Sequence, residues 1–470
     1  MLYNTFIFPF VFAVIVLFYY LIPMKVKMAY LLLVSLGFYA LWNPAHLPLL
    51  VLMILYAYAA GRFVEAKAPG KCVFAVLIAI LFLPLVLCKY GGPALSMPVG
   101  LSFYSFIAAG YLFDVRRCSV RAEKSFLRFA LFLSFFPQQC AGPIERAGHM
   151  LPQLSEKKHT LSFENVEIGS LYMLWGYVLK SIIADQIKPM TDGVFSADYH
   201  TLSGVTLLLT VFLYSIQIYC DFAGYSYLVM GAAKILDIDV IRNFRAPYYA
   251  VSTSDFWRRW HISLTSWLTD YIYIPLGGNR KGKIRQYLNI AIVFFVSGIW
   301  HGNGLSFIVW GLINAFYQIM GKLLKPFRDR MVSVLHIRRD SGIHKIFRTA
   351  VTFVLIAFSW IFFRAPSLKM ALTYIKCIVR QPFVMRYDGG DLPMLIPSAS
   401  IETILLLVFF IFLAALVDRH LYRGEDETQK FLKKKEWIKV LVFFFLFMSV
   451  VIFGVYGPKF NEADYIYKQF

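Results

Sequence analysis

Long apolar segments recur from one end of the chain to the other, separated by short polar stretches. Two of these segments, 125–136 and 222–236, are too short or too polar for confident spans and fit re-entrant or interfacial helices. The others approach the length that a helix needs to cross a membrane: 5–22, 28–42, 47–61, 72–88, 97–115, 169–185, 203–220, 286–300, 305–321, 349–364, 401–417 and 438–456. The pattern predicts an all-α, multi-pass membrane protein with about 11–12 transmembrane helices and no separate soluble domain.

Basic residues gather in the polar stretches between the apolar segments. Cytoplasmic loops of membrane proteins carry an excess of Lys and Arg, so these loops are expected inside the cell, and alternation of the helices puts both termini and the turn 301–304 outside. The segment 365–400 is also basic although parity places it outside, which fits an amphipathic helix in the interface. The six cytoplasmic basic loops are 25–27, 62–71, 116–124, 242–285, 322–348 and 419–439.

Composition excludes an ordinary soluble protein. Of 470 residues, 59% are hydrophobic and only 16% are charged. The net charge of +20 lies in short loops, so it points to anionic lipid headgroups and membrane orientation, with no nucleic-acid partner expected. The six cysteines are scattered without CxxC or other metal-site spacing, so no metal site is predicted.

A histidine ends an apolar segment in which the only other ionisable groups are tyrosines. His301 lies sixteen residues after Arg285, a helical rise of about 24 Å, whereas the bilayer core is about 30 Å thick. His301 is therefore expected below the far surface of the membrane. An imidazole at that depth is costly and usually faces a water-filled cavity at a reaction or transport site. The alternative is a structural histidine at a helix end.

The region 243–282 is amphipathic and dense in aromatic and basic residues. Arg258, Arg259 and Arg280 could donate to phosphate groups, and the turn Gly277-Gly278-Asn279 could bring backbone N–H groups together as an anion site. The alternative is an interfacial helix whose arginines extend toward the headgroups.

Three stretches of this sequence resemble a known family. Asp255-Phe-Trp-Arg-Arg-Trp-His-Ile-Ser-Leu, Tyr273-Ile-Pro-Leu-Gly-Gly-Asn-Arg-Lys-Gly and Ser297-Gly-Ile-Trp-His-Gly are similar to motifs of the membrane-bound O-acyltransferase (MBOAT) family, in the branch that O-acetylates alginate and peptidoglycan. Supporting similarities extend from about residue 85 to 321. By motif position, the resemblance implies that His301 is the essential histidine and His261 its partner, in a fold whose helices enclose a tunnel.

The end of the chain carries a second resemblance. Tyr465-Ile-Tyr-Lys-Gln-Phe is similar to the ending of the alginate branch and to the acyl-carrying tail of the teichoic acid D-alanylation system, although Lys468 replaces the usual aromatic residue. The resemblance implies that Tyr467 accepts the acyl group; a tail that merely ends in aromatic residues is the alternative. We therefore divide the chain into a membrane domain, 1–456, and an extracytoplasmic tail, 457–470.

The resemblance implies an enzyme of the bacterial cytoplasmic membrane. It would move an acetyl group from cytoplasmic acetyl-CoA to an extracellular or periplasmic polysaccharide, alginate-like or peptidoglycan, directly or through a secreted SGNH-type partner. Acetyl-CoA is then a donor substrate, and no bound cofactor is expected. One alternative is another MBOAT reaction, with a D-alanyl or lipid acyl group. A transporter or flippase is the other, although the internal symmetry usual in transporters is not evident in the sequence.

Overall fold

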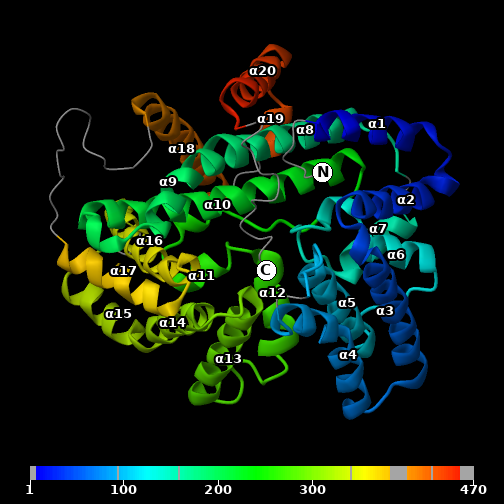
Figure 1. Ribbon diagram of the computed structural model, residues 1–470, viewed down its shortest axis with the longest axis horizontal. Helices are drawn as coiled ribbons and strands as arrows, with labels where there is room; N and C mark the ends of the chain where they lie inside the picture. Colours follow the sequence, from blue (N-terminus) through cyan, green and yellow to red (C-terminus); the bar gives the residue numbers. More distant parts are fainter. Residues whose placement is uncertain are drawn as a thin grey trace.

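The computed structural model describes residues 7–92, 95–156, 159–338, 341–381, 400–424 and 427–455. Within these ranges the chain forms helices and no strands, as predicted (Figure 1). The helices, including short 3₁₀ and π-helical stretches labelled η, are α1 (Phe8–Leu21), α2 (Met24–Trp42), η1 (Pro44–His46), α3 (Leu47–Lys67), α4 (Lys71–Tyr90), α5 (Leu101–Arg116), α6 (Phe126–Ser134), η2 (Phe136–Gln138), α7 (Ala147–Glu156), α8 (Phe163–Tyr177), η3 (Val178–Ala184), α9 (Asp185–Ser196), η4 (Tyr199–Thr201), α10 (Gly204–Ile235), η5 (Pro247–Tyr249), α11 (Thr253–Trp257), α12 (Ile262–Leu268), η6 (Thr269–Tyr273), α13 (Lys283–His301), α14 (Leu305–Leu323), α15 (Lys325–Val334), α16 (Gly342–Arg364), α17 (Leu368–Arg380), α18 (Ile401–Tyr422), α19 (Glu427–Leu432) and α20 (Glu436–Phe453).

Fewer helices than predicted have the length and composition of a membrane span. In the described part of the chain, eight helices qualify, or nine if α14 and α15, bent by 51°, form one span. The prediction of about 11–12 transmembrane helices included three segments whose helices lack the length or composition of a membrane span. α1 has 14 residues and α5 has 16, both short for a bilayer, and the first turn of α13 carries Lys283 and Arg285.

The polar segment 222–236 is not a separate short helix. It continues the preceding apolar segment in α10, which runs unbroken for 32 residues, so that part of the prediction is wrong. The predicted segments 203–220 and 222–236 meet at Asp221, a charged residue in the middle of the helix. In the structure, Lys180 Nζ lies 2.6 Å from a carboxylate oxygen of Asp221 and 2.6 Å from one of Asp185. The charge of Asp221 is therefore balanced inside the protein, and the helix continues past it.

Two pairs of glycines bring α8 and α10 into close contact. A Cβ added at Gly231 would lie 2.4 Å from the carbonyl oxygen of Gly169, and one added at Gly224 would lie 2.8 Å from that of Gly176. The glycines are seven residues apart in each helix, which is two turns, so both pairs lie on one contact face. Figure 1 shows these two long helices side by side across the molecule.

The segments 125–136 and 365–400, which were not predicted to span the membrane, also form helices. The first is α6 (Phe126–Ser134), which is mostly buried and too short to span. The first part of the basic segment 365–400 forms α17, in which Ala371, Tyr374 and Cys377 make one buried face. The prediction of an amphipathic helix is confirmed there; residues 382–399 lie outside the described ranges.

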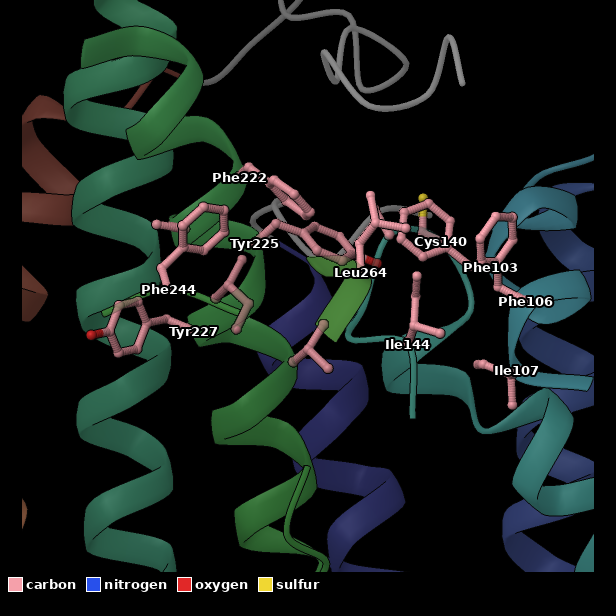
Figure 2. Close-up of a cluster of buried hydrophobic side chains, with 14 of the residues drawn as sticks. Phe103, Phe106, Ile107, Cys140, Ile144, Phe222, Tyr225, Tyr227, Phe244 and Leu264 are labelled. Atoms are coloured by element: carbon pink, nitrogen blue, oxygen red, sulfur yellow. The ribbon is translucent and has the colours of Figure 1, made fainter. Parts of the chain in front are cut away.

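A layer of aromatic and aliphatic side chains joins α10 to α5. Figure 2 shows Phe222 and Tyr225 of α10 on one side and Phe103 of α5 on the other, with Cys140 and Ile144 between them. All five are buried. This apolar layer forms one wall of the region that contains the two predicted histidines.

Candidate active site

His301 is the last residue of α13, and close packing of α13 against α14 fixes its position. A Cβ added at Gly298 would lie 2.6 Å from the carbonyl oxygen of Phe307, and one added at Gly311 would lie 2.3 Å from that of Phe294. Only glycine allows the two backbones to approach this closely. The motif Ser297-Gly-Ile-Trp-His-Gly therefore has a packing role.

The His301 imidazole lies in an aromatic pocket built by three helices. Its ring centroid is 4.6 Å from that of the preceding Trp300, 4.9 Å from Trp310 of α14 and 5.3 Å from Phe363 of α16, each contact edge-to-face. His301 is only 2% exposed. The histidine is therefore buried at the end of α13, and its depth in the membrane and its role stay predictions.

His261 lies in the same region, directly before α12. Its ring meets Phe222 of α10 edge-to-face at 4.7 Å and lies 6.1 Å from Trp300, the tryptophan that also contacts His301. The two histidines are close enough for a positive charge on one to disfavour a positive charge on the other. The structure thus brings together two residues that are forty positions apart in sequence.

The backbone of His261 adopts an unusual conformation. Its φ angle is +44°, in the left-handed region that is uncommon for residues other than glycine. Burial lowers the pKa of the His261 imidazole to about 3, so the ring is neutral at neutral pH. A neutral imidazole can accept a hydrogen bond at one nitrogen while it donates at the other.

Asn243 connects His261 to the helices around it, and the sequence analysis did not identify it as a site residue. Its side-chain oxygen accepts a hydrogen bond from the Ser263 hydroxyl at 2.6 Å and lies 3.4 Å from Nδ1 of His261. Its amide nitrogen donates to the Ser226 hydroxyl of α10 at 3.3 Å, and its backbone oxygen accepts from the N–H of Ile262 at 2.9 Å. A proton on His261 Nδ1 would point to Asn243, leaving the lone pair on Nε2.

Lys89 is a second residue that the sequence analysis missed. Its ammonium group, in the last turn of α4, donates to the backbone oxygen of Trp300, and the neighbouring Tyr90 hydroxyl donates to that of Ile299 at 3.1 Å. The last carbonyl groups of a helix have no partner within it, and a cation there is favourable. Lys89 therefore anchors the end of α13 next to His301. A lysine at the end of an apolar segment gives no sequence signal for this contact.

The three predicted donor-binding arginines have different surroundings. Arg259 donates to Asp255 at 2.9 Å and lies over the ring of Tyr422, 4.6 Å from its centroid. It is therefore engaged within the protein. Arg258 and Arg280 are exposed, which leaves their guanidinium groups accessible to a phosphate.

The glycine turn does not form the expected backbone anion site. Gly277 and Gly278 have φ angles of +105° and +55°, so the turn does need glycine. Their N–H groups, however, donate to the carbonyls of Ile274 and Tyr273, both at 2.9 Å. The prediction that these amides converge on an anion is wrong, because the turn itself uses them.

Tyr467 lies outside the described residues, so its place relative to the histidines is not given. The described chain ends at Val455, just after α20, where the Val455 N–H donates to the carbonyl of Ser181 in η3 at 3.2 Å. Gln186 of α9 adds a second hydrogen bond, from its side-chain amide to the carbonyl of Phe453 at 3.1 Å.

Comparison with known proteins places this arrangement in a family. Residues 119–364, a little more than half of the chain, match the profile of MBOAT, the membrane-bound O-acyltransferase family. The chain belongs to this family. The matched region includes both histidines and the helices α13, α14 and α16 that build the pocket of His301. Membership confirms that the chain is an acyltransferase, and the transporter alternative is set aside.

Individual relatives agree with this assignment. The chain is 33% identical to a peptidoglycan O-acetyltransferase of Helicobacter pylori over 395 residues, which cover 74% of this chain and 73% of the relative. It is 32% identical to a probable alginate O-acetylase, AlgI, of Pseudomonas fluorescens over 382 residues, covering 79% and 74%. A teichoic acid D-alanyltransferase of Bacillus subtilis is 26% identical over 291 residues, covering 56% and 70%.

Proposed function

We propose that this chain takes an acetyl group from acetyl-CoA on the cytoplasmic side of the bacterial inner membrane and passes it to a hydroxyl of a polysaccharide outside. A tunnel through the helices that links the two sides, and termini on the outer side, are part of this proposal. The acceptor class is supported by relatives that are named for O-acetylation of peptidoglycan and alginate. The observation that carries the chemistry is the buried pair His301 and His261, whose rings both lie next to that of Trp300.

The pair can perform an acyl transfer without a metal ion. A nitrogen of His301 takes the proton of the acceptor hydroxyl as that oxygen attacks the acetyl carbonyl carbon. The carbon–sulfur bond of acetyl-CoA breaks, and the same imidazole returns the proton to the leaving thiolate. The products are an acetyl ester and free coenzyme A. Neutral His261 accepts a hydrogen bond and orients the acceptor.

Acetyl transfer is favoured over D-alanyl transfer by the degree of similarity. The two O-acetylation relatives share 33% and 32% identity over about three quarters of this chain, whereas the D-alanyltransferase shares 26% over 56%. A lipid acyl group is not favoured by any of these relatives. Exposed Arg258 and Arg280 are the side chains that we propose contact the phosphates of acetyl-CoA.

Donor identity can be tested with the purified protein in nanodiscs. Incubation with radiolabelled acetyl-CoA, the SGNH-type partner and an acceptor, either peptidoglycan fragments or alginate oligosaccharide, should release coenzyme A thiol and label the acceptor. The label should be alkali-labile, as expected for an O-acetyl ester. Labelling by a D-alanyl carrier protein with none by acetyl-CoA would overturn the donor assignment.

We further propose that Tyr467 carries the acetyl group between the histidine pocket and the final acceptor, which a secreted SGNH-type partner then acetylates. A phenolic hydroxyl is more acidic than a sugar hydroxyl and is more readily activated. Tyr467→Phe removes only that hydroxyl, so acceptor labelling should be lost. Mass spectrometry of the C-terminal peptide should find the acetyl ester on the wild-type tyrosine. The matched control is Tyr465→Phe, which should label the acceptor like the wild type. Normal acceptor labelling by Tyr467→Phe would show that the transfer does not pass through Tyr467.

A further inference from the structure

A large cavity lies between α8, α10, α18 and α20, and the proposed acetyl transfer does not account for it. Its volume is about 980 Å³, at the upper end of the range for ligand pockets. Its walls differ in character along its length. Apolar side chains from the three outer helices line one part: Leu171, Trp175, Leu413, Val417, Phe445 and Leu446.

The other end of the cavity is basic. Arg242 lies there partly buried, and its guanidinium donates to the Tyr172 hydroxyl at 3.3 Å, which in turn lies 3.0 Å from the Thr428 hydroxyl. None of the described carboxylates lies within ion-pairing distance of Arg242. A partly buried guanidinium without a carboxylate costs free energy, and an anionic ligand would remove that cost.

A second arginine adds to this charge. Arg245 also lines the cavity, with its guanidinium against Gly424 at the end of α18. Lys234 and Asp239 neutralise each other at 2.9 Å. Glu164 is then the remaining acidic residue among the described side chains of the lining, against two arginines. The excess charge at this end is positive and is carried by planar groups that suit a phosphate.

The cavity is bounded by helices that face the membrane. α18 and α20 both qualify as spans and expose large apolar side chains on their outer surfaces, among them Phe409, Phe412 and Phe444. A ligand entering between these helices comes from the bilayer, where the available anionic amphiphiles are phospholipids. A soluble anion would not need the apolar part of the wall.

We propose that this cavity binds one anionic phospholipid, with its phosphate between Arg242 and Arg245 and its acyl chains along the apolar wall. The site adjoins the histidine pocket, because Ile262, the residue after His261, is part of the lining. The Arg245 N–H also donates to the carbonyl of Arg259 at 3.0 Å. The lipid therefore contacts the segment that positions His261 and stabilises it.

The test uses the full-length protein, delipidated in detergent and then titrated with dioleoylphosphatidylglycerol, with native mass spectrometry to count bound lipid. Arg242→Gln and Arg245→Gln should each weaken retention about tenfold, since each removes charge-assisted hydrogen bonds. Arg338→Gln is the matched control, because Arg338 is exposed outside the cavity, and it should bind like the wild type. Leu171→Trp keeps every charge and fills the apolar part, so it should also reduce binding. This variant decides the question if Arg242→Gln does not fold.

Two further arms identify the source of the phosphate. Dioleoylphosphatidylcholine has the same chains and a phosphate but no net charge, and it should bind about tenfold more weakly than the anionic lipid. Coenzyme A should not displace the bound lipid. Displacement by coenzyme A would assign the cavity to the acyl donor and overturn the proposal, as would unchanged retention in Arg242→Gln and Leu171→Trp. Lipid retention does not depend on acetyl transfer, so this result is independent of the proposed function.

Discussion

His261 combines a strained backbone with a neutral ring, and both depend on residues far away in sequence. The backbone oxygen of Asn243 accepts a hydrogen bond from Ile262, the residue that follows His261, and Phe222 packs against the His261 ring. The sequence motifs were enough to select His261 and His301. They could not identify Asn243 or Lys89, because an asparagine in a loop and a lysine at a helix end carry no distinctive pattern. Their roles come from hydrogen bonds that form only when distant segments pack together.

Substitution of His261 separates chemistry from folding. Asparagine is tolerated at positive φ, whereas alanine is strained there. His261→Asn should therefore unfold at a temperature close to that of the wild type, and His261→Ala at a lower one. Both should lose acceptor acetylation by about a hundredfold if the imidazole orients the acceptor. A stable His261→Asn protein with wild-type acetylation would show that His261 is structural.

Helices α8 and α10 show what the hydrophobic pattern can and cannot predict at the scale of elements. The apolar runs located both helices. The pattern divided α10 in two, because segment 222–236 is polar and the pattern could not show the pairing of the Asp221 carboxylate with Lys180. The amphipathic helix α17 was predicted because the segment 365–400 is basic although parity places it outside, and the structure shows one buried face along it.

Glycine substitutions test the contact between these two helices. In Gly224→Ala, the added Cβ would lie 2.8 Å from the carbonyl oxygen of Gly176 and 2.9 Å from the backbone nitrogen of Lys180. Forcing the backbones apart should destabilise the protein by about 1–3 kcal/mol. The matched control is Gly37→Ala in α2, where a Cβ meets nothing within 4 Å. Thermal unfolding in one detergent compares the two, and equal midpoints would contradict the close contact.

At the scale of the whole molecule, composition and hydrophobic pattern were sufficient to predict an all-helical membrane protein. Among the described residues, fewer helices than predicted have the length and composition of a membrane span, because α1 and α5 are short and α13 begins with charged residues. The convergence of α12, α13, α14 and α16 on one aromatic pocket depends on tertiary packing. The spacing of residues in the sequence could not predict this convergence.

The exposed arginines provide a test of where the donor binds. Arg258→Ala combined with Arg280→Ala should weaken acetyl-CoA binding about tenfold, because two guanidinium groups that can contact phosphates are removed. The measurement is equilibrium binding of radiolabelled acetyl-CoA to purified protein. Arg338→Ala is the exposed control and should bind normally. Unchanged affinity in the double variant would place the phosphates elsewhere.

The most direct test of the central claim is the activity of His301→Gln. Glutamine is polar and similar in size but cannot exchange a proton near neutral pH, so acetyl transfer to the polysaccharide should fall by at least about a hundredfold. Acetyl-CoA binding and the elution volume in size-exclusion chromatography should stay at wild-type values, which would show that the protein is intact. Near-normal acetylation by this well-folded variant would contradict the assignment of His301 as the proton carrier.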